Sequence, residues 1–244
     1  MIEIEKLRID FGGAPVVDGV SLAVAPGERV GLIGESGSGK SLTALAVLGL
    51  LPPGARAAGR VAIDGTDVLG LPERRLARLR GDRVAMVFQE PMTALDPVMR
   101  VGRQLALVSS KARARELLEL VGLPADTYRA YPHQLSGGQR QRIVLAIALA
   151  RDPAVLICDE PTTALDVRVQ ARVLDLIDGL AAERGAGLLF VSHDLAVVSN
   201  LCSRVLVMRA GRVVESGPVA EVLAAPRHEY TAALLAASDL EART

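Results

Sequence analysis

The chain has 244 residues, and its 28 Lys and Arg residues balance 28 Asp and Glu residues to a formal net charge of zero. This balance argues against a protein that covers itself with a basic surface for nucleic acid. Half of the residues are hydrophobic, but the longest apolar stretch, 42–51, stops at Pro52 and is shorter than the ~18 residues that a membrane helix needs. The N-terminus alternates like a strand and has no signal-peptide core, so we expect a soluble protein that stays in the cytosol.

Disulfide and zinc chemistry have little support in the sequence. Cys158 and Cys202 lie far apart, and a disulfide is not expected in a reducing compartment. His133, His193 and His228 are scattered and lack the spacing of zinc ligands. We therefore expect neither a disulfide nor a zinc site.

The N-terminal third alternates between strand patterns and glycine turns. Residues 2–9 and 16–24 predict two strands, and 29–34 predicts a buried strand that leads into a glycine loop and then a helix over 41–51. The stretches 60–64 and 212–216, each next to glycine, have the pattern of antiparallel strands. Apolar runs typical of parallel strands recur at 83–88, 154–158, 187–192 and 204–208.

Helical periods dominate the middle of the chain. We expect helices over 111–123 and 139–151, and a third over 167–180. The third places these residues on one face: Val169, Val173, Leu176, Ile177 and Leu180. The pattern predicts a single α/β domain over 1–244, with a parallel-sheet core from 1–94 and 151–244, an N-terminal antiparallel β element, and a helical subdomain inserted at about 95–150.

The sequence GESGSGKS fits the phosphate-loop pattern G-x-x-x-x-G-K-[ST], with a strand before it and a helix after it. Its glycines allow backbone N–H groups to wrap a phosphate at the helix N-terminus. Lys40 is expected to reach the β- and γ-phosphates, and the Ser41 hydroxyl to bind Mg²⁺. The expected ATP-binding residues here are Gly34, Glu35, Ser36, Gly37, Ser38, Gly39, Lys40 and Ser41. The alternative is a glycine-rich turn that binds nothing.

A second half-site follows from VLICD, an apolar strand that ends in Asp159. A carboxylate at this place can hold Mg²⁺, and Glu160, the next residue, can act as general base toward the attacking water. The alternative is that Glu160 is only a solvated acid of the loop.

Two nearly identical heptads raise the question of which glutamate is catalytic. EPMTALD spans 90–96 and EPTTALD spans 160–166, but Gln89 precedes the first and Asp159 the second. A neutral amide can touch Mg²⁺ or the water but cannot neutralise a divalent ion. Since the chain has one phosphate loop, we expect Glu160 to be catalytic and Glu90 not, with both heptads in loops at the same edge of one sheet.

The stretch LSGGQRQR opens the helix expected over 139–151. Ser136 has the position of an N-cap, and two glycines allow close backbone approach. The chain therefore has a second helix start suited to phosphate, which suggests that one of the two serves a neighbouring subunit.

GESGSGKS, LSGGQ, VLICDEP, TALD and VSHD in this order resemble the ATP-binding cassette ATPases over essentially the whole chain. The resemblance implies a P-loop NTPase with a RecA-like core in which two ATP molecules are sandwiched between two subunits. It makes Gln89 the Q-loop glutamine, Asp166 the D-loop acid and His193 the switch histidine that contacts the γ-phosphate. It makes Ser136, Gly137, Gly138 and Gln139 the signature, which with Asp166 serves ATP in trans, and adds Gln89 to the Mg²⁺ ligands Ser41 and Asp159.

Phe11 matches the aromatic residue that stacks on adenine in these ATPases. A phenylalanine near a strand end is also a common core residue, so both interpretations of Phe11 stay open. For His193 the alternative is a purely structural histidine.

FQEPMTALDPVMRVGRQL, EPTTALDVRVQARVLDLI and the tail PVAEVLAAPRHEYTAALL resemble the ATPases of dipeptide, oligopeptide and nickel importers. The resemblance implies an identical or paralogous ATPase partner, two membrane permease subunits, a solute-binding protein reached indirectly, no nucleic acid, and a place on the inner face of the cell membrane. Two departures stand out: the connection 105–110 is short, and no cysteine follows Cys202, so no iron–sulfur cluster is expected. A non-transport cassette acting on ribosomes or nucleic acid, and an exporter ATPase, remain as alternatives.

Overall fold

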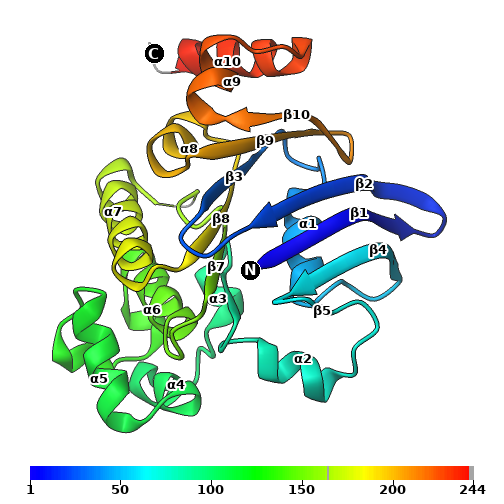
Figure 1. The fold of residues 1–244 in the computed structure, drawn as a ribbon. Coiled ribbons are helices and arrows are strands. Elements are labelled where there is room, and N and C mark those ends of the chain that lie inside the picture. Colours follow the sequence, from blue (N-terminus) through cyan, green and yellow to red (C-terminus); the bar gives the residue numbers. More distant parts are fainter. Residues whose placement is uncertain (164, 242–244) are drawn as a thin grey trace. The chain divides into compact units, whose positions relative to one another are not determined.

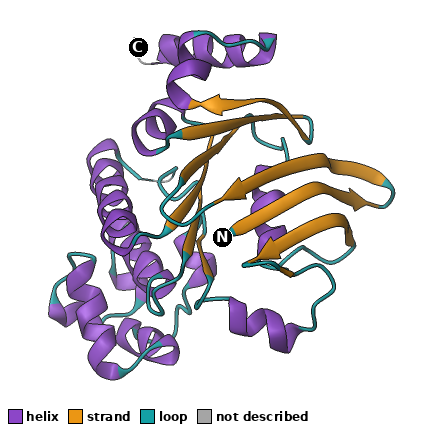
Figure 2. Cartoon of the chain, in the orientation of Figure 1, coloured by secondary structure: helices purple, strands orange, loops and turns teal. Residues whose placement is uncertain are grey.

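The structure is a computed structural model that describes residues 1–163 and 165–241. The chain divides into two compact units, one made of Met1–Leu79 with Gly187–Thr244 and the other of Arg80–Ala186. Figure 1 labels the elements and Figure 2 colours them by type. Each unit is described by itself below.

The first unit begins with an antiparallel sheet of strand order β2-β1-β4-β5. Its strands are β1 (Ile2–Phe11), β2 (Ala14–Val24), β4 (Ala55–Ile63) and β5 (Thr66–Asp67). Ile2 pairs with Val24 on one side and with Ile63 on the other. Ile2, Ile4, Leu7 and Ile9 of β1 are buried and the residues between them are not, and this alternation shifts by one residue at 5–6, where the strand pairing is irregular. The antiparallel β element predicted from the sequence is confirmed.

The same unit contains a second group of strands in the order β10-β9-β3-β8. They are β3 (Arg29–Ile33), β8 (Gly187–Ser192), β9 (Arg204–Arg209) and β10 (Arg212–Pro218). β3 is parallel to both β8 and β9, and β10 is antiparallel to β9. The helices of this unit are α1 (Lys40–Val47), α2 (Glu73–Leu79), α8 (Leu195–Leu201), α9 (Val219–Ala224) and α10 (Glu229–Glu241).

The helix predicted over 41–51 is shorter in the structure, because α1 ends at Val47. Gly49 has a positive φ of 61°, a conformation that favours glycine. The Leu50 amide donates to the Leu45 carbonyl over 3.0 Å, and the Gly49 amide donates to the Ala46 carbonyl over 3.1 Å. These two bonds form a Schellman-type end, so the apolar residues that follow do not continue the helix.

The second unit contains two strands, β6 (Val84–Val87) and β7 (Val155–Asp159), which are parallel and pair Val87 with Cys158. Its helices, drawn mainly from cyan-green to yellow in Figure 1, are α3 (Pro91–Ala94), α4 (Val101–Val108), α5 (Lys111–Leu120), α6 (Gly137–Ala148) and α7 (Val167–Arg184), with 3₁₀ turns η1 (Ala125–Arg129) and η2 (Pro132–Gln134). The α/β fold predicted from the sequence is confirmed.

The predicted apolar face of α7 is the buried one. Val173, Ile177 and Leu180 are buried, and Val169 and Leu176 are half-buried. Among the described residues, none of the helices combines the length and the apolar composition that crossing a membrane requires.

Candidate functional site

The phosphate loop connects the end of β3 to the start of α1 in the first unit. Gly34, Gly37 and Gly39 have φ angles of 149°, 80° and 100°. A Cβ atom on Gly34 would lie 2.1 Å from the Met208 carbonyl oxygen, so a side chain would be both strained and obstructed there. The loop therefore depends on glycine for its shape.

Lys40 is drawn into this loop rather than extended into solvent. Its Nζ donates to the Gly34 carbonyl over 2.7 Å and to the Glu35 carbonyl over 2.8 Å, and the residue is only 4% exposed. The Ser38 Oγ is also buried and has no hydrogen-bond partner among the described residues. An ammonium group and an unsatisfied hydroxyl in a glycine loop at the start of a helix fit a polyphosphate.

His193 leaves the sheet beside this loop. Ile33 of β3 pairs with Ser192 of β8 in a parallel register, so the next residues, Gly34 and His193, leave the two strands at the same edge. His193 is exposed. The γ-phosphate contact expected of His193 stays a prediction, and this register places the residue at the same sheet edge as the phosphate loop.

Phe11 is the last residue of β1 and pairs with Ala14 of β2 and Ala55 of β4. It is half-buried and lies outside the set of buried apolar residues. Two residues after Ala14, the Val16 carbonyl oxygen lies 3.1 Å from the position of a Cβ on Gly39. The hairpin that carries Phe11 thus passes the phosphate loop, which favours a ligand-facing aromatic over a core residue.

In the second unit, the ends of β6 and β7 bring Gln89 and Glu160 together. Aligning the two heptads by sequence puts Gln89 at the position of Asp159. The strand pairing of Val87 with Cys158 instead places Gln89 opposite Glu160, an offset of one residue. The Gln89 Nε2 donates to the Glu160 Oε2 over 3.2 Å, and the Thr163 Oγ1 donates to the same oxygen over 3.1 Å. Two donors therefore fix the direction of this carboxylate.

Glu160 also has an unusual backbone, with a φ of 45°. Non-glycine residues rarely adopt this conformation, and it costs about 1–3 kcal/mol where it occurs. Asp159, directly before it, is the last residue of β7 and is 7% exposed. The chain thus turns sharply between a buried carboxylate and one held by two side chains.

The magnesium ligands expected from the sequence are oxygen donors on different elements. Asp159 ends β7, Gln89 follows β6, and Ser41 is exposed in the first turn of α1. Carboxylate, amide and hydroxyl oxygens suit Mg²⁺, which usually takes few protein ligands and completes its shell with phosphate and water. In each of the two units, the expected ligands therefore carry the kind of donor atom that Mg²⁺ accepts.

The first heptad is built differently from the second. Glu90 is exposed, and its side chain makes no hydrogen bond or ion pair with the described residues. Asp96, which ends this heptad, is held by Gln104, whose Oε1 accepts from the Asp96 amide over 3.0 Å and whose Nε2 donates to the Asp96 carbonyl over 2.9 Å. In the second heptad, Asp166 instead caps α7 by accepting from the Val169 amide over 3.0 Å; Ala164 lies outside the described residues.

The signature stretch starts α6 as the sequence predicts. The Ser136 Oγ accepts from the Gln139 amide over 3.3 Å, and the Gln139 side chain accepts from the Ser136 amide over 2.9 Å, which is a capping box. A Cβ atom on Gly138 would lie 2.2 Å from the Val169 Cγ1, whereas one on Gly137 would meet only the Leu165 Cδ2 at 3.6 Å. Packing against α7 therefore explains why position 138 is glycine. Gly137 is exposed, and its packing among the described residues does not explain why glycine stands there.

Thr163 and Gln104 are polar contacts that the sequence did not reveal. Thr163 donates to the Glu160 carboxylate across a turn, and Gln104 accepts from the Asp96 amide across a loop. Both contacts depend on how the chain folds. The only signal for Thr163 was its place three residues after Glu160. No pattern pointed to Gln104.

The model of the family described as "ABC transporter" matches residues 17–163 of this chain. The chain belongs to the ABC transporter family. This family assignment agrees with the resemblance drawn from the ordered motifs.

Relatives within the family have peptide-transport names. The chain is 50% identical to the oligopeptide transport ATP-binding protein OppD of Mycobacterium tuberculosis, over 96% of the chain and 41% of that protein. It is 46% identical to the probable D,D-dipeptide transport ATP-binding protein DdpD of Escherichia coli, over 96% of the chain and 77% of that protein. The chain spans less than half the length of the first of these relatives.

Solved structures of ABC cassettes share the fold. A dimeric structure of the ATP-binding cassette MJ0796 in a post-hydrolysis state, bound to ADP and Pi, has a TM-score of 0.79 and 29% identity, and covers 90% of this chain and 99% of that one. The cbiO1 protein of Clostridium perfringens, part of the ABC transporter complex cbiONQ, also has a TM-score of 0.79, with 27% identity over 92% of this chain and 90% of that one.

Proposed function

We propose that the chain binds and hydrolyses ATP as the nucleotide-binding subunit of an ABC importer for peptides. The observation that carries the ATPase activity is the carboxylate of Glu160, which directly follows Asp159 and is oriented by two side-chain donors. The peptide substrate rests on the names of the relatives OppD and DdpD. Nickel, the other solute expected from the sequence, has no such support among these relatives.

In the first unit, the phosphate loop binds the polyphosphate through backbone amides and the Lys40 ammonium group. Two carbonyls hold that ammonium within the loop. His193 leaves the same sheet edge and contacts the γ-phosphate as a hydrogen-bond donor. Phe11 stacks on the adenine ring, since its ring is half-buried rather than enclosed in the core. Ser41 offers its hydroxyl to the metal ion.

In the second unit, Asp159 binds Mg²⁺, with Gln89 as a further ligand. When bound, this ion would neutralise charge on the phosphate oxygens. Glu160 accepts a proton from the attacking water, for which its carboxylate must be ionised and aimed. The bonds from Gln89 and Thr163 to Oε2 orient the carboxylate for this role.

Two such subunits, identical or paralogous, pair when ATP is bound. Each then offers its signature residues Ser136, Gly137, Gly138 and Gln139, with Asp166, to the ATP held by the other. The exposed Ser136 and Gly137 at the start of α6 support this arrangement.

Ser136→Arg should block ATP-driven pairing by crowding the γ-phosphate, while ATP binding by the same chain is retained. Light scattering with ATP measures the pairing. A wholly monomeric wild-type population, with the partner subunit also supplied, would contradict it.

The helical residues at about 95–150 form a subdomain that receives two permease subunits on the inner face of the membrane. Val98 is 82% exposed and Leu107 is 70% exposed, and these two apolar side chains are candidates for burial against a permease. The solute-binding protein is reached only through the permeases.

Peptide uptake into vesicles tests the whole proposal. The chain, its partner ATPase and two candidate permeases are reconstituted, and uptake of a labelled oligopeptide is followed with ATP inside or absent. We expect uptake only with ATP and none with Lys40→Ala in this chain. ATP hydrolysis that does not respond to permeases, but rises with ribosomes or nucleic acid, would instead support a non-transport cassette.

A further inference from the structure

The phosphate loop is joined to the C-terminal helix by a hydrogen bond at Glu35, a variable position of the phosphate-loop motif. The Glu35 amide donates to the Tyr230 Oη over 2.9 Å, across 195 positions of sequence. Glu35 is exposed, whereas Tyr230, in the first turn of α10, is 6% exposed. One N–H group of the loop is therefore bound by a buried phenol from the tail.

The position of this phenol is fixed on two sides. The Arg209 guanidinium lies over the Tyr230 ring with its Cζ 4.9 Å from the ring centroid, a cation–π arrangement. The Tyr230 amide donates to the His228 Nδ1 over 3.1 Å, so the imidazole caps the start of the helix. The ring is thus held by β9 and by its own helix start.

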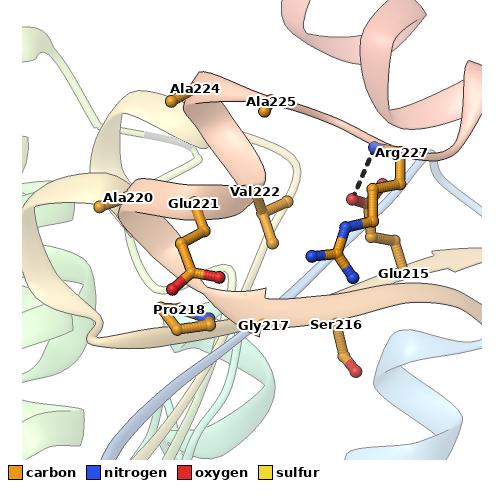
Figure 3. Close-up of a pocket in the computed structure, with 10 residues that line it drawn as sticks. All are labelled: Glu215, Ser216, Gly217, Pro218, Ala220, Glu221, Val222, Ala224, Ala225 and Arg227. Carbon is orange, nitrogen blue, oxygen red and sulfur yellow. Dashed lines mark hydrogen bonds between the residues drawn. The ribbon is translucent and has the colours of Figure 1, made fainter.

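The segment that leads into α10 is anchored in turn by Glu215 of β10. Its Oε1 accepts from the Arg227 amide over 2.9 Å and its Oε2 accepts from the His228 amide over 3.1 Å. Figure 3 shows Glu215 and Arg227 joined in this way, beside the cavity between β10 and α9. A continuous set of hydrogen bonds therefore runs from β10 through the tail to the phosphate loop.

The contact matters because the loop acts through its backbone. A phosphate loop binds through N–H groups that must point inward together. The Glu35 amide is committed to Tyr230, and its carbonyl accepts from Lys40. The peptide units on both sides of Glu35 are thus held, one by the tail and one by the ammonium group that reaches the phosphates.

We infer that Tyr230 is a positioning residue for nucleotide binding: through the Glu35 amide, the C-terminal helix sets the conformation of the phosphate loop. This inference rests on the proposed ATP binding. It assigns the tail a role in nucleotide affinity, in addition to its packing within the first unit.

Tyr230→Phe tests the inference, because it removes one oxygen and keeps the ring against Arg209. A net hydrogen bond accounts for about a 3- to 10-fold change in an equilibrium constant. We expect ATP to bind about that much more weakly and KM for ATP to rise by the same factor, with kcat at saturating ATP changed less than about twofold. Exchange of the Glu35 amide proton, followed by NMR on the full-length ¹⁵N-labelled chain without nucleotide, should become faster.

The matched control is Tyr128→Phe, which removes the same atom from a half-buried tyrosine of the second unit. It should leave ATP affinity, KM and the Glu35 amide unchanged. Unchanged ATP affinity and Glu35 exchange in Tyr230→Phe would overturn the inference, as would a loss of kcat with no change in KM. If the wild-type chain binds no ATP, the proposed function fails instead, and faster Glu35 exchange in the variant would still establish the tail-to-loop contact.

Discussion

The side-chain amide of Gln89 donates a 3.2 Å hydrogen bond to the carboxylate of Glu160, 71 residues later in the chain. The parallel register of β6 and β7 makes this contact possible, because both residues leave the sheet at the same edge. Gln89, which precedes the first heptad where Asp159 precedes the second, is thus in contact with the glutamate of the second heptad. A movement of the loop after β6 would alter the orientation of the proposed general base.

Gln89→Ala should therefore act on turnover rather than on nucleotide affinity. It removes one of two donors to the Glu160 Oε2, and we expect kcat to fall about 3- to 10-fold while the Kd for ATP stays within about twofold. Thr163→Val removes the other donor and should have a similar effect on kcat. In reconstituted vesicles, Gln89→Ala should also reduce transport per ATP hydrolysed, and Thr163→Val should not. Parallel losses of affinity and turnover would contradict this role for Gln89.

The two signature glycines should respond differently to the same substitution. A Cβ on Gly138 would lie 2.2 Å from Val169, so Gly138→Ala should destabilise the fold by about 1–3 kcal/mol. Gly137→Ala meets no close atom and should leave the free energy of unfolding within about 0.5 kcal/mol. Urea denaturation measures both. If Gly137→Ala is as destabilising as Gly138→Ala, the packing explanation is wrong.

Gly137→Ala also tests the pairing of two subunits. We expect this variant to bind ATP normally and to show weaker ATP-driven association, because the added methyl group lies on the exposed start of α6. Light scattering, beside an ATP titration of the same sample, separates the two effects. Association at the wild-type level would count against a role of Gly137 toward a partner.

Glu215 should make the docking of the tail sensitive to acid. Burial raises the pKa of this carboxyl group, but the hydrogen bonds from the amides of Arg227 and His228, together with the charge of Arg227, hold the pKa below its ordinary value. A carboxyl group with a lowered pKa in the folded state adds stability above its unfolded pKa of about 4.3, and this stability is lost as the pH falls through the folded value.

Glu215→Gln removes this titration while keeping the shape of the side chain. The wild-type chain should melt at a higher temperature than the variant between about pH 6 and 8, and the difference should shrink below about pH 4. Other carboxyl groups titrate equally in both proteins, so the difference isolates Glu215. A difference in Tm that stays constant down to pH 3 would show that ionisation of Glu215 does not stabilise the tail.

The sequence predicted those parts of the site that are short and local. The phosphate loop could be recognised because strand, glycines, lysine and helix follow one another within a few residues. The order of the motifs likewise predicted the family. The predicted end of α1 lies beyond the observed end at Val47. The apolar residues that follow fit a helical pattern, and the sequence does not reveal that Gly49 adopts a left-handed conformation.

Contacts made by ordinary residues across long sequence separations could not be predicted in this way. Tyr230 reaches a backbone amide 195 residues earlier, and tyrosine in a tail helix has no distinctive spacing to reveal that partner. The one-residue offset between the two heptads depends on the register of β6 and β7. The different roles of Gly137 and Gly138 depend on where α7 packs.

Phosphate release by Glu160→Gln and Glu90→Gln, measured side by side at saturating ATP, tests the central claim most directly. Both variants replace a carboxylate by an amide of the same shape, but only Glu160 follows Asp159 and is held by Gln89 and Thr163. We predict that Glu160→Gln loses a factor of ~10²–10⁴ in turnover while it retains ATP, and that Glu90→Gln stays within about threefold of the wild type. If Glu90→Gln is the more damaging substitution, Glu160 is not the catalytic base.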